Sequence, residues 1–103
     1  MTGWNPDVVF PVLADPIRRR VLLALANGEP KTATQLTGAS SRRLDATLKH
    51  LLALRNAGLV ITRDDPVDSR RQLYSLSPAV PLTKTEKGIE LDFGFVLLRI
   101  AVE

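Results

Sequence analysis

The residues best suited to chemistry in this sequence are two adjacent arginines that follow an aspartate in the segment DPVDSRRQLYSL, residues 65–76. Asp68, Arg70 and Arg71 stand just before an alternation of apolar and polar residues that is typical of a strand. Guanidinium groups bind phosphates and carboxylates through planar, paired hydrogen bonds. The arginines therefore indicate contact with an anionic partner, unless they form a solvated turn or a charged edge that prevents sheets from pairing.

Other kinds of chemistry have little support in the composition. The chain of 103 residues has no cysteine and one histidine, His50, which excludes disulfides and thiolate metal ligands. The carboxylates are scattered, so we expect neither a metal site nor a cofactor. No nucleophile with its base and no phosphate-binding glycine loop is visible, so the protein is not expected to be an enzyme. The net charge of +3 permits an acidic partner without requiring one.

Four helices are predicted from capping residues and apolar periodicity. The first two begin at Asn5-Pro6 and Asp15-Pro16, where an N-cap residue precedes a proline, and the second ends at Asn27-Gly28. The run Thr32–Gln35 is typical of a capping box that opens a short helix through about residue 36. A longer helix is expected over residues 42–56, ending before a glycine.

The segments LVITR (59–63) and RQLYSL (71–76), joined by turn residues, predict a β-hairpin. Helix, helix, short helix, longer helix and hairpin follow each other in the order of a winged helix-turn-helix. We therefore expect a mainly α fold with a small β-hairpin wing over residues 1–80, and a further segment, 81–103, that packs on this core or on a partner. Residues 77–88 are predicted to be a connecting loop.

The segment 88–102 is predicted to be a long strand with apolar residues on both faces, which must be covered on both faces. A second copy of the chain would supply one cover, which predicts a homodimer. The alternatives are a core strand within one subunit and a terminal helix. The expected dimer interface consists of apolar residues from the first helix and from this segment: Trp4, Val8, Val9, Val12, Phe93, Phe95, Leu97, Leu98 and Ile100.

The longer helix has two distinct faces when residues advance by about 100° each. The predicted core face contains Leu44, Thr47, Leu48, Leu51, Leu52 and Leu54. The predicted outer face contains Arg42, Arg43, Asp45, Ala46, Lys49, His50 and Ala53. Three cations against one acid, with small residues between them, favour close approach to the major groove of DNA.

The wing and this helix together predict a protein that binds double-stranded DNA. The candidate DNA contacts are Ser41, Arg42, Arg43, Asp45, Ala46, Lys49, His50, Arg63, Arg70, Arg71 and Gln72. Asp68 is expected to fix the shape of the wing by accepting hydrogen bonds from Arg70 or from turn amides. The alternative function is a winged-helix interaction module whose basic face docks an acidic protein.

Three stretches resemble known regulators. LADPIRRRVLLALANGE (13–29) and TLKHLLALRNAGLV (47–60) resemble the ArsR-type winged-helix repressors, and the wing RDDPVDSRRQLYSLSP (63–78) is similar to the MarR-type pattern. The resemblance implies a homodimeric bacterial regulator that binds palindromic operator DNA, with recognition-helix positions over 42–50 and a wing arginine at Arg70 or Arg71. Thiolate-based metal sensing, common among ArsR-type proteins, is excluded without cysteine. The sequence identifies no small-molecule effector.

The sequence also bears on where the protein works. It begins with no basic and apolar leader, and its longest apolar run is too short to span a membrane. We therefore expect a cytoplasmic protein without membrane contact.

Overall fold

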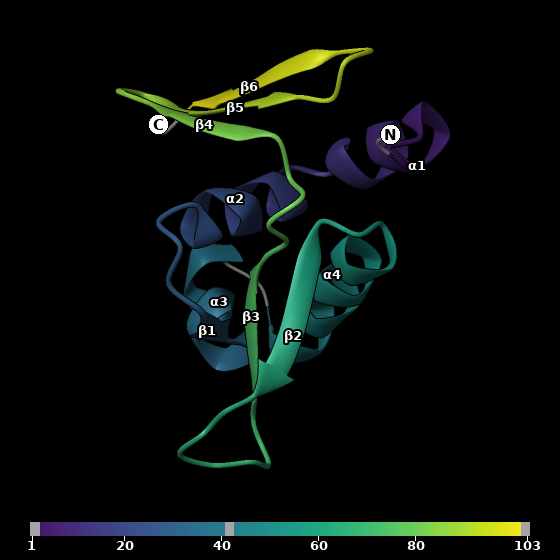
Figure 1. Ribbon diagram of the computed structural model, residues 1–103. Helices are drawn as coiled ribbons and strands as arrows, with labels where there is room; N and C mark the ends of the chain where they lie inside the picture. The colour runs from purple at the N-terminus through teal and green to yellow at the C-terminus, as the bar shows by residue number, and fades with distance from the viewer. Residues whose placement is uncertain (1–2, 41–42, 102–103) are drawn as a thin grey trace.

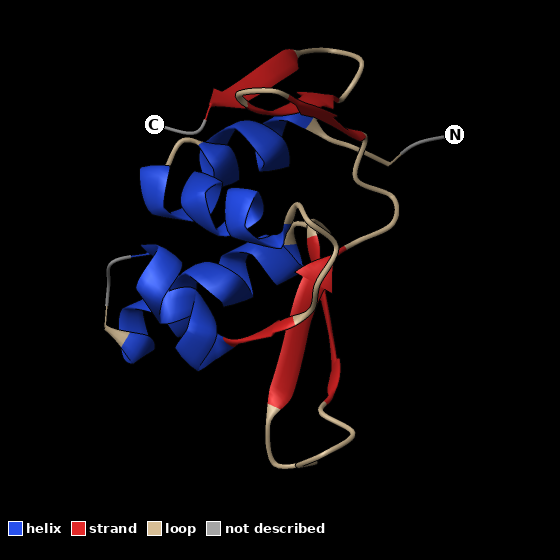
Figure 2. Ribbon diagram, turned by 90° about the vertical axis from the view of Figure 1, so that its left-hand side faces the viewer, coloured by secondary structure: helices blue, strands red, loops and turns tan. Residues whose placement is uncertain are grey.

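The computed structural model of the chain describes residues 3–40 and 43–101, in which four helices lie between two small antiparallel sheets (Figure 1, Figure 2). The helices are α1 (Pro6–Leu13), α2 (Pro16–Leu25), α3 (Ala33–Ser40) and α4 (Leu44–Asn56). The strands are β1 (Lys31–Thr32), β2 (Val60–Asp64), β3 (Gln72–Leu76), β4 (Leu82–Thr85), β5 (Gly88–Asp92) and β6 (Leu97–Ala101). The first sheet is the predicted wing, and the fold is the predicted winged helix-turn-helix.

The predicted capping residues begin three of the helices. Asn5 Oδ1 accepts a hydrogen bond from the amide of Asp7 (2.9 Å), and Asp15 Oδ1 accepts one from the amide of Ile17 (2.7 Å). Partial burial alone would raise the pKa of Asp15. The Ile17 amide, the charge of His50 and the Arg18 amide together lower this pKa below its usual value. The carboxylate form of Asp15 is therefore the one that caps α2.

The capping box at α3 is confirmed. The amide of Thr32 donates to Gln35 Oε1 (2.8 Å), and the amide of Gln35 donates to Thr32 Oγ1 (3.2 Å). This reciprocal pair satisfies two amides at the start of the helix that have no partner within it. The helix is longer than predicted, since it extends to Ser40.

The end of α4 is set by Gly58, which has a φ of +83°. The amide of Leu59 donates to the carbonyl of Leu54 (3.0 Å), and the amide of Gly58 donates to that of Arg55 (3.0 Å). These two bonds form a Schellman motif, and the buried side chains of Leu54 and Leu59 accompany it. The helix therefore ends where the sequence predicted.

Two of the three consecutive arginines in α2 serve the end of the preceding helix. Arg19 Nη1 donates to the carbonyl of Leu13 (2.8 Å), and Arg18 Nη1 donates to that of Val12 (3.4 Å). Carbonyls in the last turn of a helix have no partner within it, so these guanidinium groups stabilise the sharp connection from α1 to α2.

The wing is a three-stranded sheet in the order β1-β3-β2. Thr62 pairs with Tyr74, and Arg63 pairs with Leu73. The two residues of β1 join the free edge of β3 directly before α3. In Figure 1 the wing projects from the helical body at the end opposite the C-terminal sheet.

The prediction of one long strand over 88–102 is wrong. The chain reverses over residues 93–96, where the amide of Phe93 donates to the carbonyl of Val96 (3.0 Å) and Gly94 has a φ of +90°. The segment before it, predicted to be a loop, contains β4. The three strands form a sheet in the order β4-β5-β6 that lies over α1 and α2 (Figure 2).

The reversal brings apolar residues from both predicted faces of the segment to one side of the sheet. Ile89 pairs with Ile100 and Leu91 pairs with Leu98, and these side chains face the helices. The opposite face carries an ion pair in which Arg99 Nη2 lies 2.8 Å from Glu90 Oε2. One chain therefore covers most of the apolar surface that seemed to need a second copy.

The core is a single cluster of buried apolar side chains from the helices, the wing and the C-terminal sheet. Trp4 packs edge-on against Phe93 with ring centroids 5.2 Å apart. Four residues expected in the dimer interface are buried inside the single chain: Val9, Val12, Phe93 and Ile100. Within residues 3–40 and 43–101, no helix is long and apolar enough to cross a membrane.

Candidate nucleic-acid interface

The orientation of α4 differs from the prediction. Leu44, Leu48 and Leu52, expected in the core, have exposed fractions of 45%, 42% and 55%. Thr47, Leu51 and Leu54 are the buried residues of the helix. The buried residues are therefore one side of the predicted core face, and the other side of that face is exposed.

The flank expected to face DNA lies partly against α2. Ala46, His50 and Ala53 are half-buried, and Arg18 Nε donates to His50 Nδ1 (3.1 Å). The two alanines allow α4 to approach its neighbours closely, which explains why this flank and not the leucine flank packs inward. His50 therefore joins two helices, and its side chain is directed toward α2.

The charged residues at the start of α4 remain exposed. Arg43 is the N-cap residue, and its side chain is 91% exposed, with Nε 3.8 Å from Asp45 Oδ1. Lys49, one turn further, is also exposed. The helix begins at Leu44, two residues later than predicted, and two of the predicted contacts, Ser41 and Arg42, lie outside the described residues.

Arg71 closes the loop of the wing by pairing with a buried acid. Its Nη2 lies 3.3 Å from Oδ2 of Asp65, whose side chain is only 9% exposed. Asp65 Oδ1 also accepts from the amide of Val67 (2.8 Å), and the amide of Asp65 donates to the carbonyl of Arg71 (2.9 Å). Asp65 was not among the predicted site residues, although it anchors one of them.

Arg70 is held differently, by Asp68 at the tip of the wing. Arg70 Nε and the amide of Arg70 both donate to Asp68 Oδ1 at 3.1 Å. The pKa of Asp68 is lowered below its usual value. The main cause is the hydrogen bond from the Arg70 side chain, followed by the hydrogen bond from the Arg70 amide and by the charge of Arg71. The prediction that Asp68 shapes the wing is confirmed, and the side chain of Arg70 stays 89% exposed.

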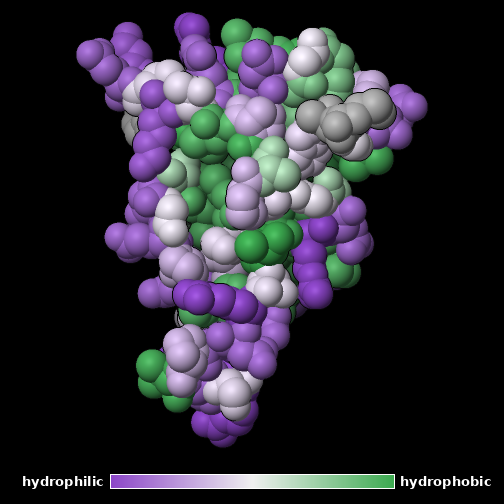
Figure 3. All heavy atoms as spheres, viewed as in Figure 1, coloured by the Kyte–Doolittle hydropathy of each residue, from purple (hydrophilic) through white to green (hydrophobic). Residues whose placement is uncertain are grey.

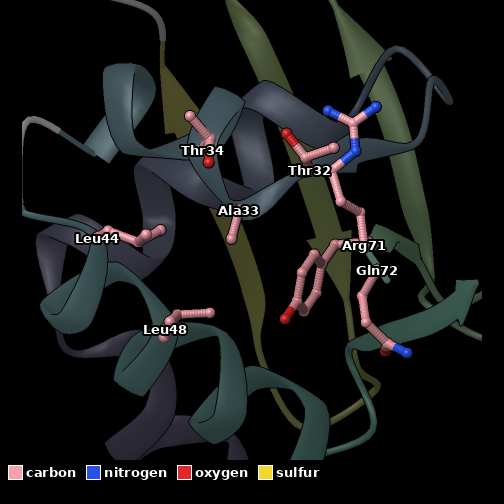
Figure 4. A pocket seen from close by; sticks show the side chains of 8 residues that line it. Thr32, Ala33, Thr34, Leu44, Leu48, Arg71 and Gln72 are labelled. Atoms are coloured by element: carbon pink, nitrogen blue, oxygen red, sulfur yellow. The ribbon is translucent and has the colours of Figure 1, made fainter. Parts of the chain in front are cut away.

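The first turns of α4 and the wing border one hollow of about 220 Å³ (Figure 4). Its lining residues come from the start of α3, from α4 and from the wing: Thr32, Ala33, Thr34, Leu44, Leu48, Arg71, Gln72 and Tyr74. Gln72 Nε2 also donates to Asp64 Oδ1 (3.0 Å). The structure thus brings the start of α4 and the wing, the two predicted contact elements, to the same hollow.

Arg63 falls on the other side of the wing. It pairs with Leu73, whereas Gln72 and Tyr74, the neighbours of Leu73 in β3, line the hollow. Successive side chains of a strand point to opposite faces, so Arg63 faces away from the hollow.

Two residues that line the hollow, Leu44 and Leu48, were not among the predicted DNA contacts. Apolar side chains four residues apart on a helix have the spacing of a core stripe. The sequence therefore predicted that both leucines are buried. Within the described part of the chain, no group of three or more histidine, aspartate or glutamate residues could hold a metal ion.

No protein-family model and no curated protein matches the chain. Solved structures do match its fold. The chain has a winged helix-turn-helix. Reduced HlyU from Vibrio cholerae is 26% identical, with a TM-score of 0.61, over 71% of this chain and 73% of its own.

Two further solved structures carry regulatory names. A probable transcriptional regulator from Pseudomonas aeruginosa is 26% identical, with a TM-score of 0.59, over 71% of this chain and 58% of its own. The adhesin competence repressor AdcR from Streptococcus pyogenes is 20% identical, with a TM-score of 0.58, over 70% of this chain and 59% of its own. This chain therefore spans less than two thirds of the length of these two proteins.

Proposed function

We propose that this protein is a transcriptional regulator that binds double-stranded DNA sequence-specifically. The observation that carries the proposal is that two cationic elements, the start of α4 and the wing, meet at one hollow. The helix would enter the major groove and the wing would contact flanking DNA. The likeness to the probable transcriptional regulator at 26% identity supports this proposal.

The residues have distinct roles in this proposal. Arg43 and Lys49, both exposed at the start of α4, bind phosphates or base edges. Arg70, oriented by Asp68, reaches flanking phosphates or the minor groove. Arg71 keeps the wing closed through Asp65 and presents its remaining N–H groups to DNA. Ser41 and Arg42 lie outside the described residues; they precede the N-cap Arg43 in the sequence and remain predicted contacts.

We also propose that the regulator acts as a homodimer and as a repressor on a palindromic operator. Val8, Phe10, Phe95 and Leu97 are exposed apolar residues, and the rings of Phe10 and Phe95 lie 5.6 Å apart. This patch, from α1, from the turn between β5 and β6 and from the start of β6, would be the contact between copies. Two copies would then bind half-sites about one helical turn of DNA apart. The name of AdcR supports the repressor role.

The test is binding to random-sequence duplex DNA across a salt series. For each phosphate that the protein neutralises, the slope of log affinity against log salt is about −0.9. We expect Arg43→Ala/Lys49→Ala to weaken binding and to make this slope shallower by roughly 2. Arg70→Ala should make it shallower by roughly 1.

The matched control is Lys84→Ala/Lys87→Ala, which removes the same charge from exposed positions on the C-terminal sheet, away from the wing (Figure 1). The control should bind like the native chain. Equal losses in both double variants would contradict the proposed surface. Failure of the native chain to bind any duplex at low salt would exclude the DNA-binding function and favour docking of an acidic protein.

A further inference from the structure

The first two turns of α4 carry an apolar pair where the proposed DNA-facing surface should be polar. Leu44 and Leu48 lie one helical turn apart and form the apolar wall of the hollow, across from Arg71 and Gln72 (Figure 4). Thr47, Leu51 and Leu54 already supply the contact of α4 with the core. Within the described part of the chain, Leu44 and Leu48 are not packed against the core cluster, so they are available to a partner.

The charges around this pair decide what kind of partner fits it. Arg71 lines the hollow together with the leucines. Arg43 and Lys49 are exposed and adjacent in the sequence to Leu44 and Leu48, and Arg43 is paired only loosely with Asp45. A second copy docked on this surface would bring these cations against one another, which disfavours self-association. An anionic partner that also offers small apolar groups fits better.

Double-stranded DNA offers both features in its major groove. Phosphates border the groove, and the C5 methyl group of thymine is its apolar feature. Residues in the first turns of a recognition helix are those that reach base edges. We propose that Leu44 and Leu48 contact thymine methyl groups and thereby determine the sequence that the protein selects. This inference rests on the proposed function.

The spacing of the two leucines limits where the thymines lie. Four residues of α-helix span about 6 Å, which is close to two base-pair steps of roughly 3.4 Å. Each selected half-site should therefore contain thymines within about two steps of one another. Burial of one methyl group is worth about a fourfold change in affinity.

The experiment removes the methyl group alone. After selection of a bound sequence from random duplexes, each thymine is replaced in turn by deoxyuridine, which lacks the C5 methyl and pairs in the same way. We expect about a fourfold loss of affinity at one or two positions per half-site and no loss elsewhere. Leu44→Ala and Leu48→Ala should each abolish the loss at one position.

Leu52→Ala is the matched control, because it truncates an exposed leucine one turn further along α4. It should keep the native response to deoxyuridine. A native chain that binds duplex DNA but responds to deoxyuridine nowhere overturns this inference and leaves the proposed function standing. Sensitivity that persists in both leucine variants also overturns it. A native chain that binds no duplex overturns both proposals.

Discussion

At the scale of residues, the two adjacent arginines of the wing have different surroundings. Arg71 pairs with Asp65, which is nearly buried, whereas Arg70 pairs with Asp68 at the exposed tip. Exposed ion pairs contribute little to stability, but a buried acceptor that loses its partners is costly. The first pair therefore holds the wing together, and the second orients a guanidinium group that remains available to a ligand.

This difference predicts unequal effects on stability. Asp65→Ala removes the acceptor of the Val67 amide and the partner of Arg71, so we expect it to lower the free energy of unfolding by about 1–3 kcal/mol. Asp68→Ala, the matched control, should lower it less, because Asp68 and Arg70 are more exposed. Urea unfolding of both variants measures the difference, and equal losses would contradict the assigned roles.

At the scale of elements, the ends of the helices were the most predictable feature of the sequence. Caps depend on a few neighbouring residues and on backbone conformation, so Asn5, Asp15 and Gly58 act as their types predict. The orientation of α4 was not predictable in this way. Its apolar arc is wide enough for several core faces, and contact with α2 selects one of them.

Replacement of Gly58, which ends α4, is expected to lower the stability of the protein. Gly58→Ala places a side chain at a φ of +83°, which should cost about 1 kcal/mol of stability. Gly38→Ala is the control, since Gly38 lies inside α3 with open space around it. That change should raise stability by about 0.5 kcal/mol. Thermal unfolding of both variants tests the pair, and a stabilised Gly58→Ala protein would contradict the Schellman motif.

At the scale of the whole molecule, the C-terminal sheet changes how the proposed dimer would be built. The sheet covers α1 and α2 within one chain, and the exposed apolar residues beside it are Val8, Phe10, Phe95 and Leu97, the proposed patch for a second copy. Figure 3 shows that hydrophilic and hydrophobic side chains occupy different parts of one face of the molecule. Hydrophilic side chains gather over the wing at the lower end, and hydrophobic ones show mainly in the middle and upper parts.

The dimer prediction follows from this patch. Phe10→Ser and Phe95→Ser should each shift a native dimer toward monomer, because each removes an aromatic ring from the proposed contact. Sedimentation analysis at micromolar concentration measures the shift, with circular dichroism to check folding. Val67→Ser is the control, since Val67 is 88% exposed at the tip of the wing. A native chain that is monomeric at all concentrations would contradict the proposed dimer. Dissociation of the Val67→Ser variant would contradict the assignment of the dimer contact to this patch.

The sequence by itself determined the helix caps, the wing hairpin and the shaping role of Asp68. These features depend on residues close together in the chain, whose backbone preferences and short hydrogen bonds act locally. Local charge also indicated Arg43, Lys49, Arg70 and Arg71 as candidate contacts; the structure shows these residues exposed, and their contact with DNA is a proposal.

Only the tertiary structure decided which face of α4 is exposed, that the segment over 88–102 folds back on itself, and that Asp65 anchors Arg71. A hydrophobic pattern predicts that a residue is buried, but it does not indicate which neighbour covers the residue. Leu98 and Ile100 have the same pattern whether they face a partner or their own helices. The turn over 93–96, which depends on packing against the helical core, makes that choice.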